Sequence, residues 1–211
     1  MREEIIAASR RLYEKNLLAG CDGNISIRLS DKEILITPSG RPKWSIRPQD
    51  IARITIDNEV LSGNPSSEML MHTAVYRKCP DARTIVHAHP PNAIAWTIAE
   101  PELKELPSEM LSELILACGA IPIALYARPG TKMMGEVLEP YLPDHKAIIL
   151  ARHGAITWGG SLEEACNGME RIEHTAYILL QARKLGPLTS LPEEEIIALR
   201  AMRKNLGNRL L

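Results

Sequence analysis

The sequence predicts a single α/β (α+β) domain, a sandwich built around a largely antiparallel sheet. Three observations lead to this expectation. The chain has 211 residues, which suits one domain with a full core of its own. Short strand-like runs come in pairs joined by tight turns, a pattern typical of antiparallel hairpins. Stretches with helical periodicity occur before, between and after these runs, so helices should pack on the sheet.

The first half of the chain predicts a helix, two hairpins, a second helix and a strand. Apolar residues recur at helical spacing through residues 2–18, and Gly20 ends the pattern. Alternating residues flank a polar turn at 30–32 and another at 57–58, which predicts two hairpins. Pro65 and the two serines after it are helix-start residues. The predicted elements are therefore a helix over 2–18, strands over 25–29, 33–37, 51–56 and 59–61, a helix from Pro65 to about Lys78, and a strand over 84–89.

The second half predicts a helix over 108–117, strands over 120–126 and 147–152, and two long helices. The first long helix starts at the capping box Ser161-Leu162-Glu163-Glu164 and ends at about Leu185, before Gly186-Pro187. The second starts after Ser190 and ends near Gly207. We therefore expect one domain over 1–211, with 187–211 as a C-terminal helical extension.

Composition excludes several classes of function. Lys and Arg number 25 against 26 Asp and Glu, and aromatic residues make up 4% with no Phe, which argues against a nucleic-acid binder. No apolar run reaches the ~18 residues of a membrane span, and the N-terminus lacks a signal-peptide pattern. The four Cys form no CxxC pair, so reduced thiols and a cytoplasmic location are expected.

The strongest chemical feature is the pair His87 and His89 in an apolar strand. Residues two apart in a strand share a face, so both imidazoles can reach one cation. Two imidazoles buried without partners would be costly, and a metal ion would satisfy both. Hydrogen-bonded core histidines remain the alternative. His153 follows a second apolar strand and would add a third nitrogen, which is the donor set of a catalytic zinc site.

Glu68 is the carboxylate of interest near these histidines. One interpretation is a favourable interaction with a helix dipole, and the other is a metal ligand that also transfers protons. His72 lies one helical turn later and could be a ligand or a neighbour of Glu68, although a packing or hydrogen-bonding role is favoured. His145 and His174 are expected to be structural.

Three short segments of small polar residues could bind an anion. They are Gly23-Asn24-Ile25-Ser26, Thr37-Pro38-Ser39-Gly40 and Pro65-Ser66-Ser67-Glu68. Backbone amides of Ser66 and Ser67 at a helix N-terminus, together with loop hydroxyls, could hold a phosphate. Turns use the same residue types, which is the simpler interpretation of each segment alone. Neither a Walker loop nor a GxGxxG motif is present.

Together these segments resemble the class II aldolase/adducin family, most closely its L-fuculose-1-phosphate aldolase branch. The similar segments follow the family's order and cover roughly residues 5–185. They are Gly-Asn-Ile-Ser-Ile-Arg (23–28), Ile-Thr-Pro-Ser-Gly (36–40), Pro-Ser-Ser-Glu (65–68) with His72, Ile-Val-His-Ala-His-Pro (85–90), Tyr-Ala-Arg-Pro-Gly-Thr (126–131) and His-Gly (153–154).

The resemblance implies a three-layer sandwich, with a central and mainly antiparallel sheet flanked by helices. It implies zinc-dependent retro-aldol cleavage of a ketose 1-phosphate into dihydroxyacetone phosphate and an aldehyde, in a homotetramer with its sites near subunit interfaces. It assigns one zinc per subunit, with Mn²⁺ or Co²⁺ as substitutes, to His87, His89, His153 and Glu68. Glu68 would also be the acid/base. The phosphate would be bound by Gly23, Asn24, Ser39, Gly40, Ser66 and Ser67.

One departure from that branch leaves other reactions open. Leu111 stands where the fuculose enzyme has a Tyr, whereas Glu109 lies nearby and resembles an acid/base of the methylthioribulose-1-phosphate dehydratase branch. Such a dehydratase is therefore the alternative reaction, with Glu109 as a catalytic candidate. A non-catalytic adducin-like assembly module is an alternative of another class. A Schiff-base aldolase using Lys43 or Lys132 is disfavoured, because neither lysine lies in a strand that looks buried.

Overall fold

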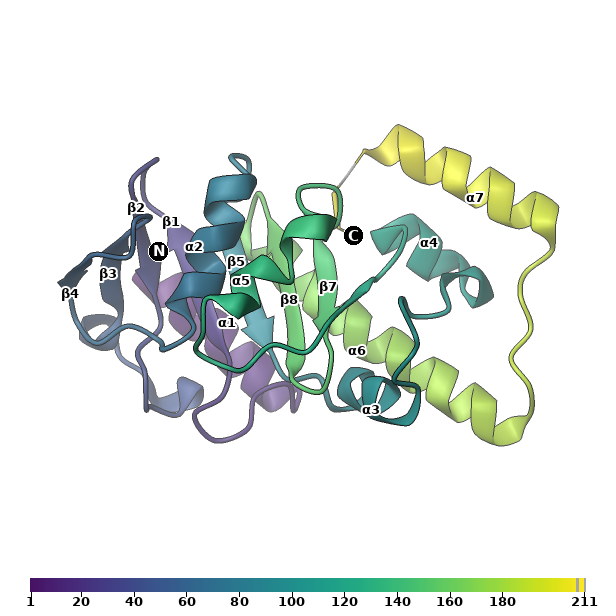
Figure 1. Cartoon of the computed structure of the whole chain (residues 1–211), viewed down its shortest axis with the longest axis horizontal. Coiled ribbons are helices and arrows are strands. Elements are labelled where there is room, and N and C mark those ends of the chain that lie inside the picture. Colours follow the sequence, from purple (N-terminus) through teal and green to yellow (C-terminus); the bar gives the residue numbers. More distant parts are fainter. Residues whose placement is uncertain (208, 211) are drawn as a thin grey trace.

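The computed structural model describes residues 1–207 and 209–210, and its centre is one eight-stranded sheet (Figure 1). The strand order is β4-β3-β2-β1-β5-β8-β7-β6. The strands are β1 (Asn24–Arg28), β2 (Glu33–Ile36), β3 (Ala52–Thr55), β4 (Val60–Ser62), β5 (Thr84–Ala88), β6 (Ile123–Ala124), β7 (Ala147–Leu150) and β8 (Gly154–Gly159). All neighbours pair antiparallel except β6 and β7, which confirms the expected largely antiparallel sheet.

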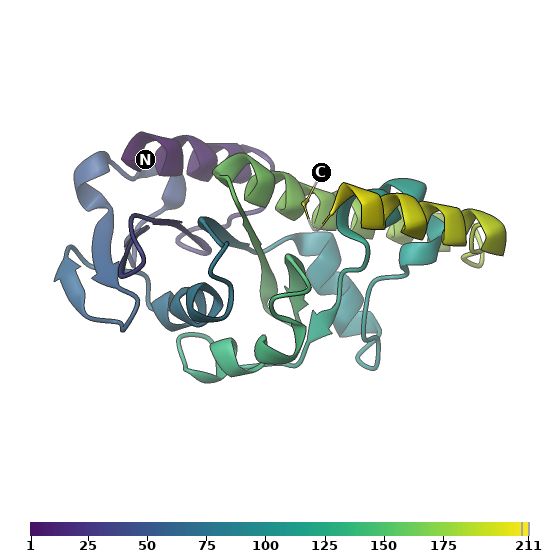
Figure 2. The ribbon, with the colours of Figure 1, turned by 90° about the horizontal axis from the view of Figure 1, so that it is seen from above.

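Helices cover both faces of this sheet (Figure 2). The α-helices are α1 (Arg2–Glu14), α2 (Met69–Lys78), α3 (Pro91–Ala99), α4 (Ser112–Cys118), α5 (Met133–Glu136), α6 (Leu162–Leu185) and α7 (Glu193–Leu206). Four 3-10 turns join them: η1 (Lys43–Ser45), η2 (Pro48–Asp50), η3 (Ser108–Met110) and η4 (Glu139–Tyr141). Helices α2 and α5 lie on one face, and α1, α3, α4, α6 and α7 lie on the other (Figure 2). The three-layer expectation is therefore confirmed.

Alternation along the strands creates a core on each face. In β1, Ile25 and Ile27 belong to the core under α1 and α6. In β2, Ile34 and Ile36 belong to the second core, which is completed by side chains of α2 and α5. Because successive strand residues point to opposite faces, polar residues on a buried strand must find partners within one of these layers. This constraint shapes the site on the α2 side of β1.

The structure differs from the sequence expectation in several elements. Strand β8 and helix α3 were not predicted, because β8 begins and ends with Gly and α3 begins in a Pro-Pro-Asn segment that resembles a turn. The expected helix over 108–117 is two elements, since Leu111 adopts an extended backbone between η3 and α4. Helix α2 begins at Met69 rather than Pro65, because Pro65 bridges Pro38 and Ser66 N–H donates to the Thr37 carbonyl.

The C-terminal segment folds back onto the body of the chain. Helix α7 packs on α4, where Arg203 Nη1 donates to the Leu116 carbonyl at 3.0 Å. Beyond α7, the buried Leu210 donates its backbone N–H to Glu164 Oε1 at 3.0 Å. No described helix combines the length and apolarity needed to cross a bilayer.

Candidate active site

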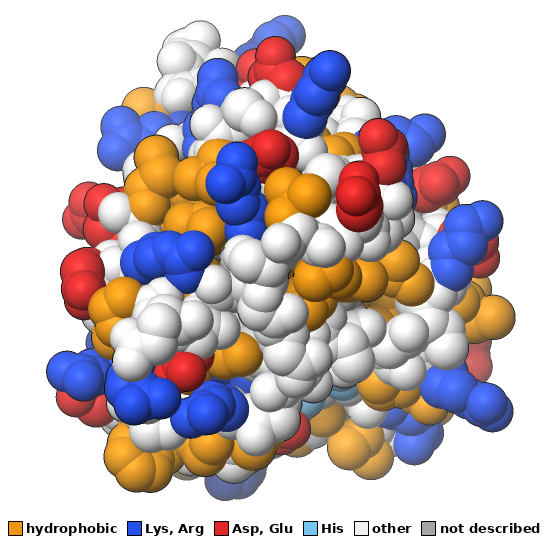
Figure 3. Space-filling model, turned by 90° about the vertical axis from the view of Figure 1, so that its left-hand side faces the viewer, with side chains coloured by type: hydrophobic (Ala, Val, Ile, Leu, Met, Phe, Trp, Pro, Cys, Tyr) orange, Lys and Arg blue, Asp and Glu red, His pale blue; other side chains and the backbone are white. Residues whose placement is uncertain are grey.

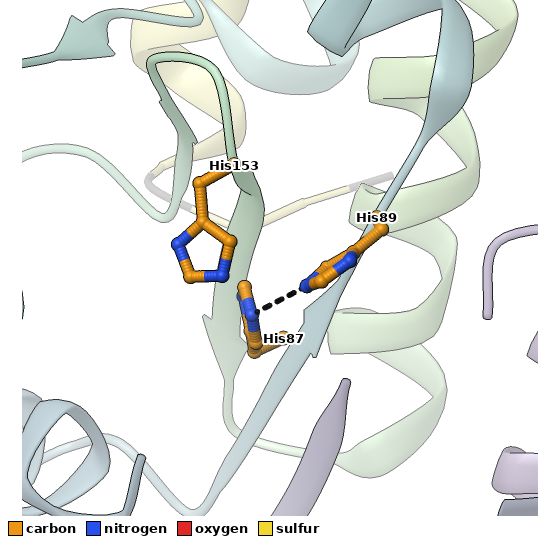
Figure 4. A group of neighbouring side chains, drawn as sticks. All are labelled: His87, His89 and His153. Atoms are coloured by element: carbon orange, nitrogen blue, oxygen red, sulfur yellow. Dashed lines mark hydrogen bonds between the residues drawn. The ribbon is translucent and has the colours of Figure 1, made fainter. Parts of the chain in front are cut away.

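Three imidazoles converge where β5 and the β7–β8 turn meet (Figure 4). His87 is on β5, His89 follows it, and His153 precedes β8. Their ligand atoms all lie within 4.8 Å of one another, and each pair of ring centroids is 5.0 Å apart. The antiparallel pairing of β5 with β8 brings together histidines that are 64 or more positions apart in the chain. The convergence predicted from the sequence is therefore present.

Hydrogen bonds orient two of these rings toward a common point. His87 Nδ1 donates to the Ala155 carbonyl at 2.9 Å, which leaves Nε2 as its free ligand atom. His89 Nδ1 faces Asp22 Oδ2 at 3.3 Å, and its Nε2 lies 3.2 Å from His87 Nε2. A carbonyl or carboxylate on the outer nitrogen is the usual support of a metal-binding histidine.

Glu68, the residue immediately before α2, completes the cluster. Its Oε2 lies 3.3 Å from His87 Nε2, and its Oε1 lies 3.2 Å from His153 Nε2. Asn24 Nδ2 donates to Oε2 at 2.7 Å. Burial by itself would raise the pKa of Glu68, but hydrogen bonds from His153, His87 and Asn24 hold it well below its usual range. The charged carboxylate is thus the form this site stabilises.

The donor set fits a metal ion such as zinc. One nitrogen from each of the three imidazoles converges with the Glu68 carboxylate. The second ring nitrogen of His87 faces the Ala155 carbonyl, and that of His89 faces Asp22. Three nitrogens plus a displaceable carboxylate form a catalytic type of zinc site, whereas structural sites are usually closed by thiolates. Burial lowers the pKa of His89 to about 3, so the ring is neutral and able to bind a cation.

A cavity of about 370 Å³ opens beside this cluster. Its lining includes Glu68, His89 and His153 together with all six residues assigned to phosphate binding, namely Gly23, Asn24, Ser39, Gly40, Ser66 and Ser67. Seen from the β4 side, only a small, partly covered area of histidine is visible, next to hydrophobic side chains and to atoms of the backbone and other uncharged residues (Figure 3). Residues of all three polar segments therefore lie around one cavity.

Two details of these segments differ from the expectation. The Ser66 N–H is bonded to the Thr37 carbonyl, and Ser66 Oγ accepts from the Glu68 N–H at 3.3 Å, so the hydroxyl proton of Ser66 rather than its amide is available to a ligand. Gly23 has a φ of +69°, and a Cβ there would lie 2.8 Å from the His87 carbonyl oxygen. A glycine is thus required at position 23 because its backbone passes close to the backbone of His87, and this holds whether or not Gly23 also binds phosphate.

Lys43 lines the cavity and is buried, although the sequence did not predict its burial. It is only 2% exposed, and its Nζ donates to the carbonyls of Cys21 at 2.7 Å and Arg41 at 3.0 Å. Burial lowers the pKa of this amine. The expectation that Lys43 is too exposed for that was wrong, because η1 folds it inward beneath the loop before β1. Lys132, by contrast, is 86% exposed.

Glu109 lies elsewhere in this chain. It is in η3, where its Oε1 accepts from Arg200 Nη2 of α7 at 2.8 Å, and it does not line the cavity. Leu111 packs beside the core under α6. His145 accepts a hydrogen bond from Trp158 through its carbonyl, and His174 lies on α6 outside the cavity. None of these four residues contributes a side chain to the described cavity.

The fold and site define the class first: a helix-flanked, mainly antiparallel sheet with three converging histidines beside a polar cavity. The sequence profile described as "Class II Aldolase and Adducin N-terminal domain" matches residues 3–180. The chain belongs to the class II aldolase and adducin family.

Named relatives within the family carry out different reactions. The chain is 34% identical to the 3-oxo-tetronate 4-phosphate decarboxylase of Escherichia coli K12 over 209 residues, covering 95% of each. It is 36% identical to the 5-deoxy-D-ribulose 1-phosphate aldolase of Bacillus thuringiensis over 199 residues, covering 92% of this chain and 91% of the relative. A solved structure of L-fuculose 1-phosphate aldolase superposes with a TM-score of 0.85 at 30% identity, covering 96% and 95%. The expected fold and class of enzyme are confirmed.

Proposed function

We propose that this chain is a zinc-dependent lyase that cleaves a ketose 1-phosphate by a retro-aldol reaction into dihydroxyacetone phosphate and an aldehyde. The observation that carries the proposal is the position of Glu68. One carboxylate contacts two of three converging imidazoles and also lines the cavity formed by the polar loops. An acid/base, a metal cluster and an anion site are therefore within reach of one small substrate.

The substrate's phosphate would bind among the small polar loops. Ser39, Ser66 and Ser67 offer hydroxyl groups around the cavity, and Gly40 has no side chain to obstruct an anion. Lys43 adds a buried positive charge whose described partners are two neutral carbonyls. Asp22 and Glu68 also attract this charge electrostatically. A dianionic phosphate beside the lysine would add a further opposite charge, which favours a phosphorylated substrate over a neutral sugar.

The zinc ion would be held by the Nε2 atoms of His87, His89 and His153, with Glu68 as the exchangeable fourth ligand. When bound, it supplies Lewis acidity toward the ketone oxygen and the charge that develops there. The chain's own groups orient the substrate: the loops hold its phosphate, while Asn24 and the histidines border the reacting end of the cavity. Glu68 then carries the proton that the three-carbon product must gain at carbon.

Decarboxylation of a phosphorylated 3-oxo acid is the second candidate, and a specific observation favours it. Retro-aldol cleavage needs a group that removes the proton from the hydroxyl that becomes the aldehyde carbonyl, whereas a carboxylate loses carbon dioxide without such a proton transfer. Among the described residues of the cavity there is no Tyr, and Glu109 is paired with Arg200 elsewhere. Both reactions leave the same type of three-carbon carbanion for Glu68 to protonate. The relative named as a decarboxylase at 34% identity supports this candidate.

The remaining alternatives are less well supported. A dehydratase that relies on Glu109 would need that carboxylate at the cavity, and in this chain it is bonded to α7. A non-catalytic assembly module has no requirement for three converging imidazoles with a carboxylate between them. A Schiff-base aldolase would use Lys43, and burial lowers the pKa of its amine as that mechanism requires. However, its Nζ is bonded to the carbonyls of Cys21 and Arg41, and a Schiff base gives the three imidazoles and Glu68 no role.

Product analysis separates these reactions. Zinc-loaded protein is offered fuculose 1-phosphate, 5-deoxyribulose 1-phosphate, methylthioribulose 1-phosphate and 3-oxo-tetronate 4-phosphate. Dihydroxyacetone phosphate and carbon dioxide are assayed separately. We expect dihydroxyacetone phosphate from a ketose 1-phosphate, sensitivity to EDTA, and loss of turnover in Glu68→Gln at unchanged zinc content. Full turnover in EDTA, or an adduct trapped by borohydride on Lys43, would refute the zinc mechanism.

We further propose a cytoplasmic homotetramer with its sites near subunit interfaces, on the resemblance to the fuculose aldolase branch. Light scattering should then give a mass of roughly 94 kDa, four times the 23.4 kDa of one chain. A mass of one chain would contradict the assembly.

A further inference from the structure

A row of polar side chains runs between β1 and α2, behind Glu68. Every second residue of β1 faces α2, and every fourth residue from Glu68 onward faces β1. Two strand residues span ~6.6 Å and four helical residues span ~6 Å. The facing side chains therefore have nearly the same spacing along β1 as along α2, and each can reach a partner. We name these six residues the β1–α2 ladder: Asn24, Ser26, Arg28, Glu68, His72 and Tyr76.

Four hydrogen bonds between side chains connect the ladder from Glu68 to Tyr76. Asn24 Nδ2 donates to Glu68 Oε2 at 2.7 Å, and Asn24 Oδ1 lies 2.5 Å from His72 Nε2. Ser26 Oγ lies 2.7 Å from His72 Nδ1 and 2.9 Å from Tyr76 Oη. Asn24, Ser26, His72 and Tyr76 are at most 2% exposed, so water does not compete for these bonds.

The direction of every bond follows from the charge on Glu68. A carboxylate only accepts, so Asn24 must turn its amide nitrogen toward it and its oxygen toward His72. His72 must then donate from Nε2, which leaves Nδ1 to accept from the Ser26 hydroxyl. Ser26 Oγ in turn accepts the Tyr76 hydroxyl proton. Burial lowers the pKa of His72 to about 3, in keeping with the neutral ring that this order of donors requires.

The far end of the ladder is anchored on the protein. The Arg28 guanidinium lies 4.7 Å from the centre of the Tyr76 ring and donates to the carbonyls of Ala82 at 2.8 Å and Tyr76 at 2.7 Å. Arg28 thereby ties β1 to the C-terminal end of α2. At the near end, Glu68 contacts the imidazole cluster, and both Glu68 and Asn24 line the cavity.

We infer that His72 is a positioning residue for Glu68 and acts through Asn24. By donating to Oδ1, His72 prevents the Asn24 amide from turning its oxygen toward the carboxylate, where the two oxygens would repel. Glu68 is thereby kept between His87 and His153, at the cavity. The inference rests on the proposed role of Glu68 in proton transfer, and it goes further by assigning a function to a buried histidine that touches neither the cluster nor the cavity.

A kinetic comparison of three variants tests this inference. His72→Leu removes the donor to Asn24. His72→Gln restores an amide that can donate to Asn24 and accept from Ser26. Thr157→Val is the matched control, because it removes a buried hydrogen bond to the Ala165 carbonyl, 2.7 Å long, on the far side of the sheet from α2.

We expect kcat to fall ~10-fold or more in His72→Leu, with zinc content unchanged and KM within about threefold, because small misplacements of a reacting group cost this much. His72→Gln should recover at least a third of the wild-type kcat. Thr157→Val should lower the Tm by about as much as His72→Leu does, and it should leave kcat unchanged. If His72→Leu keeps the wild-type kcat, or loses it only in proportion to lost zinc, the inference is wrong.

A spectroscopic test does not depend on turnover. In protein labelled with 15N-histidine, the His72 resonances are identified by their loss in His72→Gln. We expect a neutral ring with its proton on Nε2 from pH 5.5 to 8.5. A proton on Nδ1, or titration near pH 6.5, would overturn the inference even if Glu68→Gln proves inactive. Conversely, a fully active Glu68→Gln would overturn the proposed function while the tautomer result stood.

Discussion

Gly154 is the position where one added methyl group should damage the site most directly. It is the first residue of β8, directly after His153, and lies near the end of β5. A Cβ at Gly154 would lie 2.5 Å from the Ala88 carbonyl oxygen, 2.9 Å from His89 Cδ2 and 3.0 Å from His87 Cε1. The contact to Ala88 is 0.9 Å short of the 3.4 Å at which ordinary contact begins, and the obstructing atom belongs to a paired strand.

The Gly154→Ala substitution must therefore move β5 away from the β7–β8 turn or turn the two rings. Overpacking of this kind costs about 1–3 kcal/mol of unfolding free energy. For a domain of this size, the Tm should fall by roughly 2–10 °C. The rings of His87 and His89 would lose their alignment with His153, so zinc affinity should fall about 10-fold to 100-fold.

The assay pairs thermal unfolding in EDTA with zinc competition against a chromophoric chelator. Gly160→Ala is the control, because the nearest atom to its Cβ would be Glu164 Oε2 at an ordinary 3.5 Å. The control should keep the wild-type Tm and zinc affinity. If Gly154→Ala matches the control in both measurements, the packing argument for the β5–β8 contact is refuted.

Three further predictions concern buried titratable side chains. Lys43→Met should raise KM for the phosphorylated substrate about 10-fold at unchanged zinc content, since the anion loses its buried cation; an unchanged KM would contradict this. Glu164→Gln should cost about 3 kcal/mol at pH 7 in urea unfolding, because Glu164 forms a buried 2.9 Å ion pair with Lys146. Burial opposes the charge of Glu164, but Lys146 and two backbone amides lower its pKa below the usual value. The stabilisation is therefore present above about pH 4.5 and is lost as the pH falls below it. A difference in unfolding free energy between wild type and Glu164→Gln that persists at pH 3 would argue against the pair. His72 has a native pKa of about 3 against about 6.5 unfolded, so only the unfolded chain binds this proton as pH falls. Zinc-free wild type should therefore lose about 2 kcal/mol more than His72→Gln between pH 8 and pH 5, and equal losses would count against a buried neutral ring.

The metal cluster shows how far local sequence patterns reach. His87 and His89 share a face because strand side chains alternate, and that holds wherever the strand lies in the sheet. His153 is predicted to end an apolar strand, but its meeting with the other two requires β5 to pair with β8. Strand β8 was missed, since its terminal glycines resemble turn residues. Residue type and strand position suggested the three histidines as one ligand set, but the sequence did not show which strands bring them together.

Buried polar groups were harder to foresee than the ligands. His72 follows Glu68 by one helical turn, so its place on the same face was predictable, but its partners Asn24 and Ser26 belong to another element. Lys43 lies in a short 3-10 turn with no periodic pattern, so nothing in the sequence showed that it is buried. Glu109 has a suitable residue type and position, yet the packing of α7 on α4 gives it Arg200 as a partner.

The sequence by itself determined the class of fold, the hairpins, the three histidines, the carboxylate and the three polar loops, because each depends on residue type and short-range spacing. Only the tertiary structure decided that β5 pairs with β8, that Lys43 is buried beneath the cavity, and that Asn24 and His72 hold Glu68. Local patterns set which face a side chain occupies. Which faces meet is decided by burial of the two cores on either side of the sheet, and that burial depends on contacts between residues far apart in the chain.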